Sequence, residues 1–232
     1  MALTNIKKVK NQKEENDISV ALLCAGIGSK IKSYEPRSLL KINSKTLIEH
    51  QIATIKESFI HPDIICVSGC YANKIVRKIK KAIRIVENQM FETTNSSESL
   101  RLAFNNSINT RFMFIHGDIF FNQQCLNVDY SESFLIVDSS QMMKDDEIGV
   151  TTIDEKASVL SYGLKTKWAQ IAYFTGKEHK ILGNILQKFE HQDKKKLSFE
   201  VINDVINAGG SFNCYEPSKM KLLEIDRIKD IR

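Results

Sequence analysis

The sequence predicts an α/β fold of three layers, in which helices cover both faces of a mixed, mainly parallel sheet. In the first half of the chain, short apolar runs typical of buried strands alternate with segments of helical spacing. Such alternation favours parallel strands, because each helical crossover returns the chain to the same edge of the sheet. In the second half, strand-like runs are less regularly spaced, which would add antiparallel strands.

The elements can be placed in order along the chain. Residues 19–23 are an apolar run before glycines, which indicates a buried strand running into a loop. Residues 46–59 carry apolar side chains at helical spacing, and residues 96–107 begin with serines, which cap helices. Further strands are expected at 63–69, 83–88, 111–118, 134–138, 159–164, 170–174, 211–216 and 220–226. Further helices are expected at 71–82, 179–192 and 199–209.

Composition bounds the class of protein. The 232 residues fit one globular domain, expected at 18–232 after a flexible polar leader at 1–17. No apolar run approaches the roughly 20 residues of a membrane span, and no signal peptide is recognised, so a cytoplasmic location is expected. The net charge of +5 suits a small polyanionic substrate better than nucleic acid. Five scattered cysteines indicate reduced thiols rather than a zinc site.

A glycine-containing loop after the first strand is the strongest functional signal. It holds Gly26, Gly28, Lys30, Pro36 and Arg37. Backbone amides beside the glycines can bind phosphate oxygens, and the cations can neutralise them. The loop is neither the dinucleotide fingerprint, which needs a third glycine, nor a P-loop, which ends in Gly-Lys-Ser/Thr. A solvated basic loop is the alternative interpretation, and the basic segment 71–82 is best explained as a solvated helix face.

Two aspartates complete the candidate chemistry. Asp118 follows the fourth strand, and Asp226 ends a late apolar run. The carboxyl ends of parallel strands meet at one edge of the sheet, where ligands bind. Taken alone, Asp118 could be a turn carboxylate and Asp226 a surface partner of Arg227 or Lys229.

Four separated segments resemble the signature of the sugar-phosphate and alcohol-phosphate nucleotidyltransferases, in their phosphocholine cytidylyltransferase-like branch. LLCAGIGSKIKSYEPRSLLKINSKTLIEHQI resembles the strand, A-G-x-G-[ST]-R, P-K and helix of that family. ENQMFETTNSSESLRLAF resembles its segment after the third strand, FIHGD its metal-binding G-D and LLEIDRIKDI its terminal element. They occur in the right order between about residues 18 and 231. The resemblance implies a three-layer Rossmann-like (GT-A-type) nucleotidyltransferase fold.

The resemblance also implies roles for individual residues. Lys30 and Arg37 would be the catalytic cations, although the family has arginine first and lysine second. Asp118 and Asp226 would hold Mg²⁺, which prefers oxygen ligands and takes one or two carboxylates from protein. Nucleotide contacts would come from Leu23, Ala25, Gly26, Gly28, Ser29, Gln89, Asn95, Ser99 and Gly117. Trp168 and Gln170 lie where the acceptor pocket of the family usually forms.

Several of these residues have a second interpretation. Asn95 and Ser99 could simply cap a helix, and Trp168 could be a core residue. His116, inside an apolar strand, is expected to pack rather than to act as a base.

The sequence therefore predicts an Mg²⁺-dependent nucleotidyltransferase. It would transfer a nucleoside monophosphate, with CTP favoured as donor, to a small phosphorylated or phosphonate acceptor and release pyrophosphate. The expected partners are these two substrates, without nucleic acid or membrane, and a homodimer stays open. The alternatives are a sugar-1-phosphate nucleotidyltransferase using UTP, dTTP or GTP, and a nucleotide-binding regulatory module in which the exchange at Lys30 and Arg37 marks lost catalysis.

Overall fold

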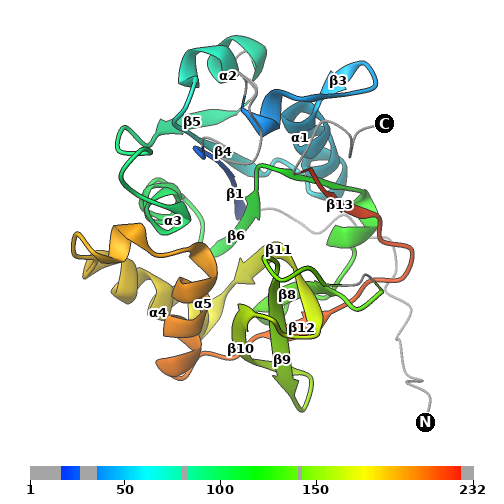
Figure 1. The fold of residues 1–232 in the computed structure, drawn as a ribbon, viewed down its shortest axis with the longest axis vertical. Coiled ribbons are helices and arrows are strands. Elements are labelled where there is room, and N and C mark those ends of the chain that lie inside the picture. Colours follow the sequence, from blue (N-terminus) through cyan, green and yellow to red (C-terminus); the bar gives the residue numbers. More distant parts are fainter. Residues whose placement is uncertain (1–16, 27–35, 80–82, 141–142, 226–232) are drawn as a thin grey trace.

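The structure is a computed structural model that describes residues 17–26, 36–79, 83–140 and 143–225. The strands of its central sheet are β1 (Ile18–Cys24), β4 (Asp63–Ser68), β5 (Arg84–Glu87), β6 (Arg111–His116), β8 (Phe134–Asp138), β9 (Ile148–Ile153), β10 (Lys156–Tyr162), β11 (Thr166–Phe174) and β12 (Asn213–Tyr215). They form one nine-stranded sheet in the order β5-β4-β1-β6-β11-β8-β12-β10-β9 (Figure 1). Two small sheets pair β2 (Lys41–Ile42) with β3 (Lys45–Thr46) and β7 (Ile119–Phe121) with β13 (Leu222–Glu224).

The predicted mixed sheet is confirmed, and its two halves differ. β5, β4, β1 and β6 run parallel, so their carboxyl ends share one edge. β11 is antiparallel to both β6 and β8, which brings the end of β8 to that same edge. Beyond β8, β12 is parallel to β8, β10 is antiparallel to β12, and β9 is antiparallel to β10. Parallel pairing is therefore concentrated in the first half of the chain.

Helices cover both faces of the sheet, which confirms the three layers. The helices are α1 (Leu47–Ser58), α2 (Ala72–Ile79), α3 (Ser96–Asn105), α4 (Gly176–Gln187) and α5 (Ser198–Asn207). One core cluster packs α1 and α2 against alternate residues of β1 such as Val20 and Leu22. The other packs α3, α4 and α5 against Ala21 and Leu23, which point to the opposite face.

Local sequence explains where these elements begin. All of β1 is buried between two neighbours, as its continuous apolar sequence requires. Helix α1 starts with a capping box, in which the Thr46 N–H donates to Glu49 Oε2 at 2.8 Å. Asn95 caps α3 by accepting the Ser96 N–H at 3.0 Å.

The structure corrects several expected boundaries. The strand-like residues after Pro36 begin as a 3₁₀ turn, η1 (Arg37–Leu39), because β2 is only a short arm of a hairpin. β7 and β9 were not predicted; β7 has three residues, and β9 ends in exposed threonines and an isoleucine. The late run ending at Asp226 does form a strand, but β13 pairs with β7 and not with the central sheet.

Two further expectations concern the N-terminal leader and membrane-spanning helices. The expected leader at 1–17 lies outside the described residues except for Asp17. No described helix has both the length and the apolar content needed to cross a membrane. The remaining short turns are η2 (Gln123–Leu126) and η3 (Asp193–Lys195).

Candidate active site

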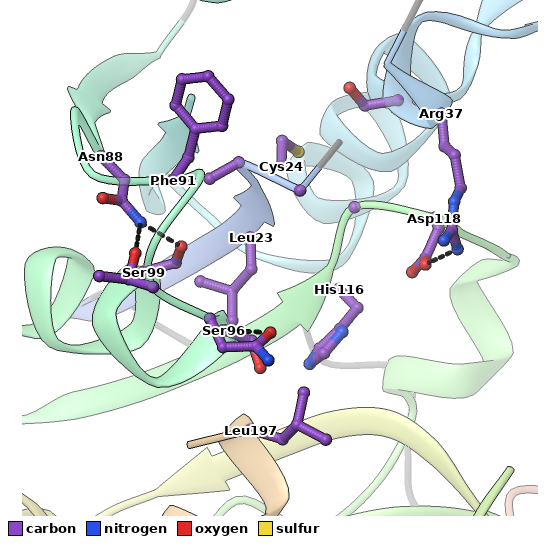
Figure 2. Close-up of a pocket in the computed structure, with 16 residues that line it drawn as sticks. Leu23, Cys24, Arg37, Asn88, Phe91, Ser96, Ser99, His116, Asp118 and Leu197 are labelled. Atoms are coloured by element: carbon purple, nitrogen blue, oxygen red, sulfur yellow. Dashed lines mark hydrogen bonds and ion pairs between the residues drawn. The ribbon is translucent and has the colours of Figure 1, made fainter. Parts of the chain in front are cut away.

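A pocket of about 270 Å³ opens at the carboxyl edge of the parallel strands. The ends of β1 and β6, the turn η1, the loop after β5 and the start of α3 form its walls, with Leu197 before α5 at its base (Figure 2). Among the described residues, sixteen line it: Leu23, Cys24, Ala25, Gly26, Arg37, Ser38, Asn88, Phe91, Thr94, Asn95, Ser96, Ser99, His116, Gly117, Asp118 and Leu197. This is the edge where the sequence placed the site.

The pocket has two chemically different ends. Figure 2 shows Arg37 and Asp118 at one end and Asn88, Phe91 and Ser99 at the other, with the end of β1 between them. The first end carries opposite charges, whereas the second combines an amide, hydroxyls and an aromatic ring. A ligand with a polyanionic part and a flat heterocyclic part matches this division.

Arg37 and Asp118 form an ion pair at the charged end. The Arg37 Nη1 donates to Asp118 Oδ2 at 2.5 Å, and both side chains are about one-fifth exposed (18% and 20%). Arg37 belongs to η1, and Asp118 lies in the turn that follows β6. The two side chains meet from these two elements. A guanidinium can bind two phosphate oxygens at once, so Arg37 can exchange its carboxylate partner for an anionic ligand.

The other carboxylate oxygen of Asp118, Oδ1, is suited to bind a metal ion. Oδ1 is buried and has no hydrogen-bond partner among the described residues. Within the described ranges, no cluster of three His, Cys, Asp or Glu side chains could bind a metal by itself. That donor set suits Mg²⁺, which takes few protein carboxylates and completes its shell with phosphate and water oxygens. A cation bound there would offset the negative charge of phosphate groups.

Close approach of β6 to β1 sets the position of Asp118. The Gly117 N–H donates to the Leu23 carbonyl at 3.0 Å. A Cβ at Gly117 would lie 2.6 Å from Cys24 Sγ, closer than any real side chain tolerates. Glycine is therefore required at this point, and it brings the following carboxylate against the end of β1.

A hydrogen-bond network organises the uncharged end. The Asn88 side chain is buried, and its Nδ2 donates to Thr94 Oγ1 at 3.1 Å and to Ser99 Oγ at 3.4 Å. Its Oδ1 accepts the Met90 N–H at 3.0 Å. Asn88 thus fixes the loop between β5 and α3, which carries Phe91 and Asn95 into the pocket wall.

The start of α5 joins the start of α3 beneath the pocket. The Ser198 N–H donates to Ser96 Oγ at 2.8 Å, and Ser198 Oγ lies 2.8 Å from His116 Nε2. Burial lowers the pKa of His116, so its ring is neutral at neutral pH. His116 therefore both packs, as expected, and lines the pocket.

Cys24, the last residue of β1, lines the pocket. A hydrogen bond with Cys66, together with burial, holds the pKa of the Cys24 thiol well above its usual range. The group is a neutral, inert thiol rather than a nucleophile. Cys66 and Cys125 are also buried free thiols, in agreement with the sequence interpretation.

The structure brings eight of the predicted residues together in this pocket: Leu23, Ala25, Gly26, Arg37, Asn95, Ser99, Gly117 and Asp118. Four others lie outside the described residues: Gly28, Ser29, Lys30 and Asp226. The Ile225 N–H, just before Asp226, donates to the Asp118 carbonyl at 2.8 Å. Ile225, which directly precedes the second predicted metal ligand Asp226, therefore contacts the backbone of Asp118.

Three predicted residues do not line the pocket. Trp168 is 2% exposed and its Nε1 donates to the Ile171 carbonyl at 3.1 Å, so it is a core residue behind His116. Gln170 lies in a bulge of β11 with a positive φ of 57°. Gln89 is exposed, and its neighbour Asn88 lines the pocket instead.

The sequence analysis missed Cys24, Ser38, Asn88, Phe91, Thr94, Ser96, His116 and Leu197 as pocket residues. Asn88, Thr94 and Ser96 had a usable signal, since they belong to the segment that carried the resemblance. Leu197 had none, because α5 reaches this edge only through tertiary packing on α3.

Residues 20–128 match the family model of the MobA-like NTP transferase domain. The matched segment covers slightly less than half of the chain. The resemblance to nucleotidyltransferases is thus confirmed, and the matched segment contains Asp118 and most of β1.

Two curated relatives align with part of the chain. An 87-residue segment is 33% identical to 2-C-methyl-D-erythritol 4-phosphate cytidylyltransferase of Thermosipho melanesiensis, covering 34% of this chain and 38% of that protein. An 85-residue segment is 33% identical to choline-phosphate cytidylyltransferase of Streptococcus pneumoniae, covering 35% of this chain and 37% of that protein. The chain therefore aligns with less than two-fifths of the length of either relative.

A solved structure extends the likeness beyond the transferase domain. The CTP:phosphocholine cytidylyltransferase from Streptococcus pneumoniae matches with a TM-score of 0.75 and 20% identity, over 93% of this chain and 96% of that one. At this identity the likeness establishes the fold alone. The predicted nucleotidyltransferase fold is confirmed over nearly the whole chain.

Proposed function

We propose that the protein is an Mg²⁺-dependent cytidylyltransferase. It transfers CMP from CTP to a small phosphorylated or phosphonate acceptor and releases pyrophosphate. The observation that carries this proposal is the divided pocket, with Arg37 and Asp118 at one end and the Asn88 network at the other. A nucleoside triphosphate has the same division, with charge at one end and a flat base at the other.

Arg37 and the loop after β1 would hold the triphosphate. The Arg37 guanidinium would exchange Asp118 for phosphate oxygens, and Lys30, which lies outside the described residues, would be the second catalytic cation. Asp118 and Asp226 would hold Mg²⁺, which supplies charge neutralisation when bound. The orphaned Asp118 Oδ1 supports this assignment.

The uncharged end would receive the base and ribose. Asn88 keeps Ser99 and Thr94 in place, and Phe91 offers an apolar face. Cytosine carries an amine donor and two acceptor atoms, which hydroxyl groups and backbone groups can match in a small pocket. The two aligned cytidylyltransferases support CTP over the other triphosphates.

The transfer step needs no general base. An oxygen of the acceptor phosphate carries negative charge at neutral pH and attacks the α-phosphorus. A new phosphorus–oxygen bond forms as the bond from the α-phosphorus to its bridging oxygen breaks, and the electron pair leaves with pyrophosphate. The protein aligns the two phosphates and offsets their charge, which are the two main sources of rate in such reactions.

Pyrophosphate release tests this proposal. The full chain is incubated with Mg²⁺, each of the four nucleoside triphosphates and a panel of phosphorylated alcohols, phosphonates and sugar 1-phosphates. We expect release with CTP and one class of acceptor alcohol phosphate or phosphonate. Turnover with UTP, dTTP or GTP and a sugar 1-phosphate would replace the proposal with the sugar-nucleotide alternative. Nucleotide binding without turnover on any acceptor would support the regulatory module.

A further inference from the structure

A buried lysine lies at the same sheet edge, outside the pocket. Lys167, near the start of β11, has a side chain only 4% exposed. Its Nζ lies 2.6 Å from Glu147 Oε1 and 3.2 Å from Glu224 Oε2. Lysines are rarely buried to this degree unless they are paired.

The three charged residues come from separate elements. Glu147 directly precedes β9, Lys167 belongs to β11 and Glu224 ends β13. The Lys144 N–H donates to Glu147 Oε2 at 2.9 Å, so this carboxylate is also held by a backbone hydrogen bond. Lys167 contacts both carboxylates, whereas the more exposed Lys144 ammonium lies 3.7 Å from Glu147. Loss of Lys167 would therefore remove the buried cation that Glu147 and Glu224 share.

The ion pair keeps both Lys167 and Glu147 charged. Burial alone would lower the pKa of Lys167, but Glu147 and Glu224 outweigh it and hold that pKa above its ordinary value. Burial alone would raise the pKa of Glu147, but its bonds to Lys167 and Lys144 hold it below the ordinary value. The network is therefore intact throughout the neutral range.

Glu224 connects this network to Asp118. It pairs with Ile119, the residue after Asp118, in the register of β13 and β7. The next residue, Ile225, is fully buried and donates its N–H to the Asp118 carbonyl. β7 and β13 have three residues each, and such short pairs have little stability of their own.

We propose that Lys167 is a positioning residue for the metal carboxylate. Its ammonium fixes Glu224, which holds β13 in place, and β13 holds the Asp118 backbone through the Ile225 amide. Lys167 does not line the pocket and acts through these residues alone. The inference rests on the proposed function, because that function gives Asp118 its metal.

Three variants of the full chain test the inference. Lys167→Met removes the charge, Lys167→Arg keeps it, and Lys156→Met removes a matched lysine whose ion pair with Glu132 is exposed. Mn²⁺ binding is measured by calorimetry with a non-hydrolysable CTP analogue present, and hydrogen exchange is measured at the Ile225 amide. We expect Lys167→Met to weaken Mn²⁺ binding about tenfold or more, as loss of an outer partner of a metal ligand does. Exchange at Ile225 should accelerate, while Lys167→Arg and Lys156→Met stay close to wild type.

A folded Lys167→Met protein with wild-type Mn²⁺ affinity and wild-type Ile225 exchange would overturn the inference. If this variant does not fold, Lys167→Met combined with Glu147→Gln leaves one buried carboxylate instead of two, and the same losses are expected. Wild-type values in the double variant would overturn the inference equally. Weakened Mn²⁺ binding in a protein that turns over no triphosphate would reject the proposed reaction and keep the role of Lys167.

Discussion

Residues 18–118 and residues 119–225 build the same sheet edge in different ways. In the first segment two pocket groups follow their own strands, since Asp118 follows β6 and Asn88 follows β5. In the second segment the edge is built by Glu147, Lys167 and Glu224, which meet from three elements far apart in sequence. Under the proposed function, the first segment would carry the chemistry and the second would hold it in place. Variants of the first should therefore change turnover most, whereas variants of the second should change stability or geometry.

Loss of the metal carboxylate gives the largest expected effect. Asp118→Ala removes both the predicted Mg²⁺ ligand and the partner of Arg37. We expect pyrophosphate release to fall about 1,000-fold, which corresponds to about 4 kcal/mol of lost transition-state stabilisation. Asp145→Ala, at an exposed loop position, is the matched control and should keep wild-type turnover. Full activity in Asp118→Ala would contradict the assignment of the metal site to Asp118 in the first segment.

Gly117→Ala tests the close approach of β6 to β1. The added methyl group would meet Cys24 Sγ at 2.6 Å and the Leu23 carbonyl oxygen at 2.8 Å. Overpacking of this kind costs about 1–3 kcal/mol of folding stability and should displace Asp118. Gly26→Ala is the comparison, because no atom of the described residues lies within 4 Å of its added methyl group. Urea unfolding should separate the two, and equal stabilities would contradict the packing argument.

Asn88→Ala tests the organisation of the uncharged end. The change removes a buried side chain that makes hydrogen bonds to Thr94, Ser99 and Met90. We expect a loss of about 1–3 kcal/mol in stability and a KM for the triphosphate about tenfold higher. Gln89→Ala changes the exposed neighbour and should leave both quantities near wild type. The reverse ranking would place the nucleotide contact at Gln89, as the sequence first predicted.

The smallest expected effect is a change in the pH dependence of stability. Because the folded-state pKa of Glu147 lies below its ordinary value of 4.5, its contribution is full above that pH and is lost as the pH falls through the folded pKa. Urea unfolding of Glu147→Gln should therefore show a shallower loss of stability below pH 4.5 than wild type. Glu87→Gln, at an exposed strand end, should follow the wild-type profile. A wild-type slope in Glu147→Gln would mean that its ion pair adds nothing to stability.

Sequence reasoning succeeded where one short segment carries both an element and its functional residue. Arg37, Gly117 and Asp118 each stand beside a strand or turn that hydrophobic patterning reveals, and parallel topology then brings them together. At the end of β5 the pocket is lined by Asn88 and not by the predicted Gln89, because neighbouring residues of an extended segment face opposite sides.

The side-chain contacts of the second segment could not be predicted from the sequence, for a physical reason. Lys167 stands in an apolar strand, and its partners Glu147 and Glu224 are 20 and 57 residues away. Nothing local distinguishes such a lysine from a surface one. Trp168 had a position typical of an acceptor wall, yet the pleat of β11 directs it into the core against Phe114.

Paramagnetic broadening locates the proposed metal most directly. Mn²⁺ replaces Mg²⁺ in the presence of CTP, and the amide signals of the isotopically labelled protein are compared with those of the Mg²⁺ form. We predict loss of the Gly117, Ile119 and Ile225 signals, which surround Asp118, while Thr152 and Lys156 in the hairpin of β9 and β10 stay sharp. Broadening in that hairpin with intact Gly117 and Ile225 signals would contradict a metal-bound nucleotide at the edge of β1 and β6.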